Sequence, residues 1–249
     1  MKFTLTRNCL HGGHICLYEV EGGKFGYLKT SSHLASIQDL TKEHSGWAWY
    51  ANRIGCQPNE LSSFDLVTKS YAKLWIQKFN GKKASYAQGL KKKSDILKII
   101  SDHYLDVWGH PSRHLHPLHG DLSLDNIILT TNSVRFIDWE HFKIKACPWG
   151  FDLFYLFFET YWFNSKMFFF NKNNSLTTLS DIFIYLAKNR NIPKKYLLYP
   201  LSTVIFFIKN NIPLWGEQLA VFPMKLPILQ FNEAEINTID DFINDKLNY

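Results

Sequence analysis

The stretch LHGDLSLDN, residues 118–126, decides how this chain is interpreted. It places a carboxylate, Asp121, five residues before a carboxamide, Asn126, and the apolar run IILT follows at once. A short apolar run that follows turn-forming residues is typical of a β-strand. The pattern therefore predicts a loop that presents two oxygen-bearing side chains immediately before a strand.

A second carboxylate, Asp138, follows another short apolar run in VRFIDWE. Residues 126–129 and 134–137 are predicted to be short strands joined by TTNS. If they pair as a hairpin, the side-chain oxygens of Asn126 and Asp138 come to one end of it. A buried carboxylate needs a metal ion or another partner, and Mg²⁺ binds carboxylate and carboxamide oxygens together with phosphate oxygens and water.

The first eighty residues are rich in strand patterns with one helix between them. Strands are expected at 2–7, 15–20, 24–30, 64–70 and 71–79, a Gly-rich turn at 21–24, and a helix at 39–54. Lys29 ends the third strand. Glu43 lies on the apolar face of the helix, where a carboxylate is costly unless it has a cationic partner. A Lys29–Glu43 pair is therefore expected.

The remaining residues are mainly helical by pattern. A helix is expected at 94–108, and the signals from Phe151 onward are mostly helical, with prolines as breaks. The apolar run 151–170 is interrupted by charged and polar residues, so a core helix is favoured over a membrane span. The sequence predicts an α+β protein with two parts, residues 1–80 and residues 81–249.

Composition limits the classes of function. The chain is 46% hydrophobic and 20% charged, which excludes a disordered protein. Residues 1–100 hold 15 Lys and Arg against 7 Asp and Glu, which suits a nucleotide phosphate, a nucleic acid or simply a solvated basic face. The aromatic residues lie in helical stretches rather than among the basic residues, so a nucleic-acid partner is not expected.

The cysteines and the N-terminus favour the cytoplasm. The four cysteines show no CxxC pairing, which favours reduced thiols. No signal peptide is apparent in MKFTLTRNCLHGG. Four histidines gather in HPSRHLHPLH, but no carboxylate or cysteine set completes a zinc site at ligand spacing, so zinc is not expected.

HGDLSLDN followed by IDW resembles the catalytic and metal motifs of the protein-kinase-like phosphotransferases. Among these phosphotransferases, the chain is closer to the aminoglycoside phosphotransferase and choline kinase branch, because of HGD, DWE and GFDLFYLFFE at 150–159. The resemblance is specific from about Pro117 to Glu159, and over residues 1–83 it lies only in the order of elements. It implies a bilobal fold: a small N-terminal lobe of antiparallel sheet plus one helix, and a larger, mainly helical C-terminal lobe.

The resemblance also implies residue roles. Asp121 would be the catalytic base, with His119 supporting its loop and Asp152 bracing that loop from the following helix. Asn126 and Asp138 would hold Mg²⁺. Lys29, oriented by Glu43, would hold the phosphates of ATP or GTP. The nucleotide would lie between the loop that contains Gly12 and Gly13 and a hinge formed by Phe79, Asn80 and Gly81.

The chain departs from the protein-kinase pattern at several points. Ser123 stands where those kinases usually have Lys, and the sequence has neither a GxGxxG loop nor an APE-like segment. The expected function is transfer of a γ-phosphate to a hydroxyl of a sugar or amino alcohol. A pseudokinase that only binds, and a kinase acting on a protein, stay open as alternatives. Tyr161, Trp162, Phe163 and Trp215 could stack on the acceptor or pack in a core.

Overall fold

The structure is a computed structural model. It describes residues 3–8, 14–20, 24–84, 90–131, 133–167, 172–211 and 226–248. The chain divides into two compact units, Met1–Gly81 with Ile137–Lys143, and Lys82–Phe136 with Ile144–Tyr249. The first carries an antiparallel sheet and the second is mainly helical, so the predicted α+β class is confirmed.

The first unit contains a five-stranded sheet whose neighbouring strands all run antiparallel. Its strands, in spatial order, are β1 (Phe3–Asn8), β2 (His14–Val20), β3 (Lys24–Ser31), β5 (Tyr71–Gln77) and β4 (Ser62–Thr68). Burial alternates along β5, where Ala72, Leu74 and Ile76 are buried. This period of two is what a sheet with one covered face requires.

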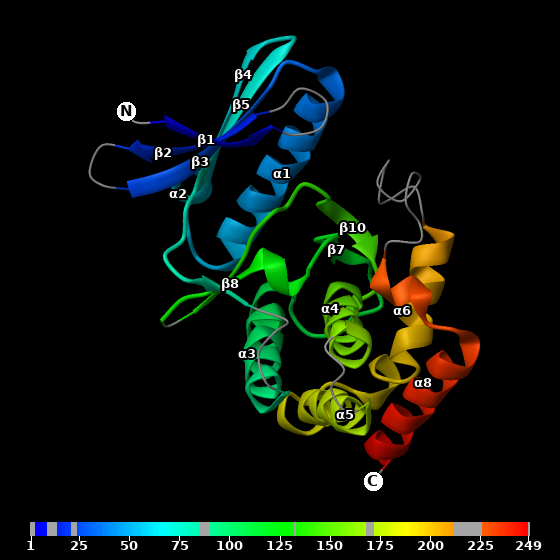
Figure 1. The fold of residues 1–249 in the computed structure, drawn as a ribbon. Helices are drawn as coiled ribbons and strands as arrows, with labels where there is room; N and C mark the ends of the chain where they lie inside the picture. Colours follow the sequence, from blue (N-terminus) through cyan, green and yellow to red (C-terminus); the bar gives the residue numbers. More distant parts are fainter. Residues whose placement is uncertain are drawn as a thin grey trace. The chain divides into compact units, whose positions relative to one another are not determined.

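Helix α1 (Leu34–Arg53) packs against this sheet (Figure 1). It begins five residues before the predicted start at residue 39, because its buried stripe already includes Ile37. The one-turn helix α2 (Pro58–Leu61), with Pro at its start, was not predicted and is a second helix in this unit. The strand and helix order expected from the sequence is otherwise present.

Residues 137–143 belong to the first unit although they are distant in sequence. Trp139 is fully buried, and its ring lies 5.1 Å from that of Tyr50 and 6.5 Å from that of Trp47, both on α1. Gly46 makes the contact possible, because a Cβ there would lie 2.6 Å from the Cβ of Trp139. An aromatic cluster therefore fixes the neighbouring Asp138 to the first unit.

The second unit is built around helix α4 (Phe151–Trp162), which is buried from Phe151 to Tyr161. The expected core helix is therefore present. The helices that pack with it or with one another are α3 (Leu90–Trp108), α5 (Lys172–Asn189), α6 (Pro200–Asn210) and α8 (Glu233–Asn248) (Figure 1). Among the described residues, no helix has the length and apolar character needed to cross a membrane.

Short strands and turns complete the second unit. Strands β8 (Ile127–Leu129) and β9 (Val134–Phe136) pair antiparallel, which confirms the predicted hairpin. Strand β6 (Lys82–Lys83), which pairs with β8, was not predicted. Strands β7 (His116–Leu118) and β10 (Lys143–Cys147), which pair with each other, were not predicted either. The short helical turns are η2 (Leu124–Asn126), η3 (Phe163–Met167), η4 (Lys194–Tyr196) and η7 (Pro227–Gln230).

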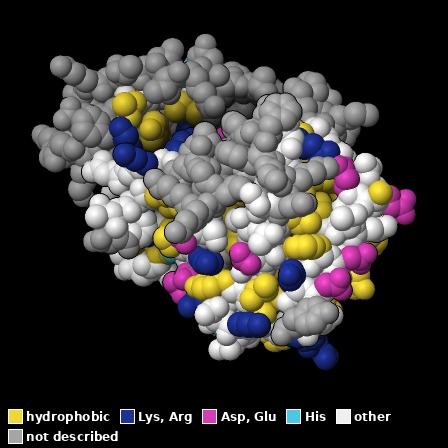
Figure 2. Space-filling view, turned by 60° about the horizontal axis from the view of Figure 1, so that its bottom comes forward, with side chains coloured by type: hydrophobic (Ala, Val, Ile, Leu, Met, Phe, Trp, Pro, Cys, Tyr) yellow, Lys and Arg dark blue, Asp and Glu magenta, His cyan; other side chains and the backbone are white. Residues whose placement is uncertain are grey.

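Charges of both signs share the surface drawn in Figure 2. On that face the described Lys and Arg side chains are interspersed with Asp and Glu and with hydrophobic side chains. A surface that binds a polyanion concentrates one sign of charge. The described part of the face in Figure 2 therefore carries charges of both signs.

His103 on α3 gives a testable pH dependence. Burial, together with the nearby Arg135, lowers the pKa of His103 to about 4, and its ring packs edge-on against Phe136 at 4.9 Å. The unfolded chain binds this proton near pH 6.5, so the contribution of neutral His103 to stability is complete above about pH 6.5 and is lost as the pH falls towards 4. We expect His103→Gln to remove an acid-induced loss of the order of 3 kcal/mol.

Chemical denaturation across this pH range measures the effect. His110→Gln is the matched control, because it makes the same change at an exposed histidine. An identical pH profile for His103→Gln and the wild type would contradict the expectation.

Candidate active site

Lys29 and Glu43 form a buried ion pair in the first unit. Lys29 lies opposite Leu74 in the β3–β5 register, so its side chain points to the sheet face that α1 covers. Its Nζ lies 2.8 Å and 2.7 Å from the two carboxylate oxygens of Glu43. The Glu43 side chain is only 1% exposed and that of Lys29 is 13% exposed. The geometry brings together the two residues that the sequence pairs.

Asp138 belongs to residues 137–143 of the first unit and lies next to this ion pair. Its Oδ1 lies 3.2 Å from Lys29 Nζ, and its side chain is 30% exposed. Burial disfavours the charged ammonium, but the carboxylates of Glu43 and Asp138 outweigh burial and raise the pKa of Lys29 above its ordinary value. Lys29 is therefore a permanent cation held between two carboxylates.

The backbone of Asp138 is strained. Its φ of 65° lies in the left-handed region, which costs energy for residues other than glycine, although aspartate tolerates it better than most. The buried Trp139 holds the backbone in place through the contacts with α1. Strain that the surrounding packing maintains is common at functional sites.

Asp152 organises the loop at 119–121 in the second unit. It lies in the first turn of α4 and is 1% exposed. Its carboxylate accepts the backbone N–H groups of His119 at 2.9 Å and Gly120 at 3.0 Å. Burial raises the pKa of Asp152 to about 7, and the two N–H groups oppose that rise. The residue that caps α4 is Gly150, at φ 81°, and Asp152 lies one residue inside the helix.

Asp121 and Asn126 meet within the same loop. Asn126 Nδ2 donates to the Asp121 carboxylate Oδ2 at 2.9 Å and to its carbonyl oxygen at 2.9 Å. The Asp121 N–H donates to Nδ1 of the fully buried His119 at 3.3 Å. Because both Asn126 bonds use Nδ2, its Oδ1 is the atom that can serve as a metal ligand. The turn η2 sets this arrangement by bringing Asn126 back towards Asp121.

The expected nucleotide-binding residues are only partly described. Phe79 stacks on Trp47 of α1 at 5.9 Å between ring centroids, while Asn80 and Gly81 are exposed. Gly12, Gly13 and Trp215 lie outside the described residues. Tyr161 is buried and stacks on Phe231, which favours a core role for it.

Sequence reasoning missed how Asp138 is anchored. The signal that could have found it is Gly46, an isolated glycine within a helical pattern, since such a residue usually has a packing reason. Trp139 beside Asp138 is the side chain that uses the space.

The comparisons with known proteins find similar folds only. No protein-family model matches the chain, and no curated protein matches its sequence. An amicoumacin kinase in complex with AMP-PNP, Ca²⁺ and Ami shares 11% identity over 99% of this chain and 88% of its own, at a TM-score of 0.49. A Legionella pneumophila kinase bound to IP6 shares 11% identity over 98% of this chain and 92% of its own, at a TM-score of 0.27. At these scores the likenesses carry no argument about activity.

Proposed function

We propose that the chain is a small-molecule kinase that transfers the γ-phosphate of ATP or GTP to a hydroxyl of a sugar or amino alcohol. The observation that carries this proposal is the arrangement of Lys29, held by both oxygens of Glu43 and 3.2 Å from Asp138. A fixed cation beside a partly exposed carboxylate suits a nucleotide phosphate and its metal ion. The HGDLSLDN loop supplies the complementary groups in the second unit.

The donor set fits Mg²⁺. Asp138 would contribute a carboxylate oxygen and Asn126 its Oδ1, and phosphate oxygens and water would complete the hard-oxygen shell that this ion prefers. When bound, the ion neutralises charge that develops on the phosphoryl oxygens.

Asp121 would act as the general base. The acceptor hydroxyl gives its proton to the Asp121 carboxylate while its oxygen forms a bond to the γ-phosphorus, and the bond to the β–γ bridging oxygen breaks to release the nucleoside diphosphate. Asn126 fixes the carboxylate through Oδ2. Asp152 fixes the backbone of His119 and Gly120, the two residues before Asp121, so the loop is held in position before the substrates bind.

We further propose that the reaction takes place in the cytoplasm. Cys16, Cys56 and Cys147 are free thiols in the described part of the chain, as expected in a reducing compartment. ATP and Mg²⁺ are also available there. A nucleic-acid partner is not part of the proposal.

A mass-spectrometric screen tests the proposed function. The chain is incubated with Mg²⁺, ATP or GTP and pooled sugars, amino alcohols, aminoglycosides and nucleosides, with Asp121→Asn in parallel. We expect one compound to gain a phosphoryl group with the wild type alone. Absence of both product and Mg²⁺–nucleotide binding would contradict the proposal and favour a pseudokinase. Labelling of protein in a lysate without a small-molecule product would instead indicate a protein substrate.

A further inference from the structure

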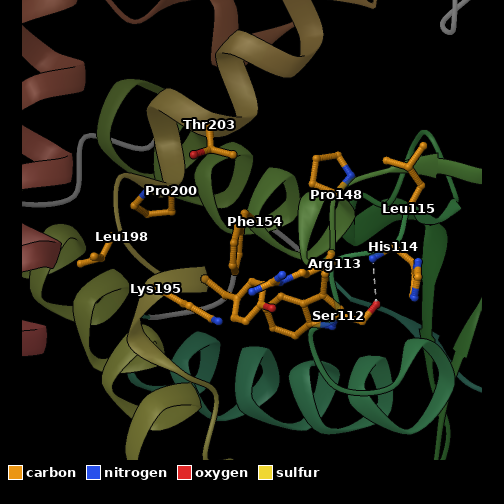
Figure 3. Close-up of a pocket in the computed structure, with 12 residues that line it drawn as sticks. Ser112, Arg113, His114, Leu115, Pro148, Phe154, Lys195, Leu198, Pro200 and Thr203 are labelled. Carbon is orange, nitrogen blue, oxygen red and sulfur yellow. Dashed lines mark hydrogen bonds between the residues drawn. The ribbon is translucent and has the colours of Figure 1, made fainter.

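The second unit contains a pocket of about 340 Å³ that none of the proposed catalytic residues lines. It lies between the loop before β7, the start of α4, η4 and the start of α6 (Figure 3). The lining residues are Ser112, Arg113, His114, Leu115, Pro148, Trp149, Phe154, Lys195, Tyr196, Leu198, Pro200 and Thr203. This volume is within the range of small-molecule sites.

The charge around the pocket has one sign. Arg113 and Lys195 come from separate segments, and in Figure 3 both side chains point towards the middle of the pocket. None of the described residues that line it is acidic, and no described carboxylate forms an ion pair with either cation. Two cations that converge without a carboxylate create a positive potential that favours a bound anion.

The wall of the pocket is aromatic and fixed. The Trp149 ring lies 6.2 Å from that of Tyr196 and 6.0 Å from that of Phe154. The indole N–H of Trp149 donates to the Gly109 carbonyl at 2.8 Å, which locks its orientation. Lys195 Nζ lies 5.1 Å from the centre of the Tyr196 ring. Rigid rings beside cations suit a ligand that has a planar apolar part and an anionic part.

The α6 side of the pocket is also held in place. Asp240 of α8 accepts the N–H groups of Leu201 at 2.9 Å and Ser202 at 3.0 Å, and the Asn244 side chain accepts the N–H of Tyr199 at 3.2 Å. These N–H groups at the start of α6 are therefore already occupied. An anion in the pocket would be held by Arg113 and Lys195 rather than by the helix terminus.

We propose that this pocket binds a small oxyanion attached to an aromatic ring, with the ring against Trp149 and Tyr196 and the oxyanion between Arg113 and Lys195. The site is distinct from the residues proposed for phosphoryl transfer, and the proposal does not depend on that function. Trp149 and Phe154 flank Asp152 in sequence, so the start of α4 borders both the pocket and the 119–121 loop.

Phenyl phosphate is the probe, and its binding to the full chain is measured by ³¹P NMR and calorimetry. We expect Arg113→Gln and Lys195→Gln each to weaken binding by about tenfold, as loss of one charge-assisted contact predicts. Lys194→Gln is the matched control, because Lys194 is exposed, adjacent in sequence and absent from the lining. Inorganic phosphate and benzyl alcohol should each bind more weakly than phenyl phosphate, and saturating Mg²⁺–ATP should not displace it.

Several outcomes would overturn the proposal. They are unchanged affinity in both charge variants, equal affinity for inorganic phosphate, displacement by Mg²⁺–ATP, and absence of binding at millimolar phenyl phosphate. Arg113 and Lys195 are both exposed, so their variants are expected to fold, and circular dichroism checks this. Benzoate in place of phenyl phosphate distinguishes a carboxylate site from a phosphate site, and tight binding of either supports an aryl oxyanion.

Discussion

Asp121→Asn is expected to lower the turnover number by about 10²–10⁴-fold, the usual contribution of a general base. The amide cannot take the proton of the acceptor hydroxyl, but its oxygen can still accept the bond from Asn126 Nδ2 that Asp121 Oδ2 accepts now. The loop therefore keeps its shape, and the thermal midpoint and the affinity for Mg²⁺–nucleotide should stay near those of the wild type. Turnover is measured with the acceptor that the screen identifies.

Asp125→Asn is the control for this prediction. Asp125 lies in the same loop and carries the same charge, but it is exposed. Its amide variant should retain most of the activity, since it removes charge from the loop without removing the base. Wild-type turnover in Asp121→Asn would rule out the assigned base, and a large loss of thermal stability would show that Asp121 is mainly structural.

The sequence predicted those elements that follow from a local pattern or from the cost of a buried charge. The β8–β9 hairpin follows from two apolar runs separated by a turn. The Lys29–Glu43 contact follows because a carboxylate on the apolar face of a helix needs a cation, and Lys29 lies near the end of a neighbouring strand. Both inferences need only residue type and spacing.

The features that were missed depend on contacts between distant segments. The packing of residues 137–143 on α1 depends on the space at Gly46 and on the buried ring of Trp139, and an isolated glycine in a helical pattern does not identify its partner. Strands β6 and β7 are too short for their period to be recognised. The pocket between Arg113 and Lys195 joins segments that are about eighty residues apart, so composition and spacing could not reveal it.

Lys29→Met is expected to reduce the free energy of unfolding by roughly 3–5 kcal/mol, the usual cost of removing one partner from a buried ion pair. Glu43, at 1% exposure, would lose the cation 2.7 Å from its carboxylate. Burial already raises the pKa of Glu43 with Lys29 present, so in the variant the carboxyl binds a proton more readily. A carboxyl group with a raised pKa contributes stability at low pH that is lost as the pH rises. The stability difference between Lys29→Met and the wild type should therefore become smaller as the pH falls from about 8 to about 5.5.

Two further variants separate the ion pair from its catalytic role. Lys42→Met removes the exposed pair with Asp39, where the side chains are 47% and 52% exposed, and should cost less than about 1 kcal/mol. Lys29→Met combined with Glu43→Leu replaces both buried charges by apolar groups and should recover most of the lost stability. If Lys29 also holds the donor phosphates, this double variant is stable yet fails to bind Mg²⁺–nucleotide. A stable double variant that still binds and transfers would show that the pair serves the fold alone.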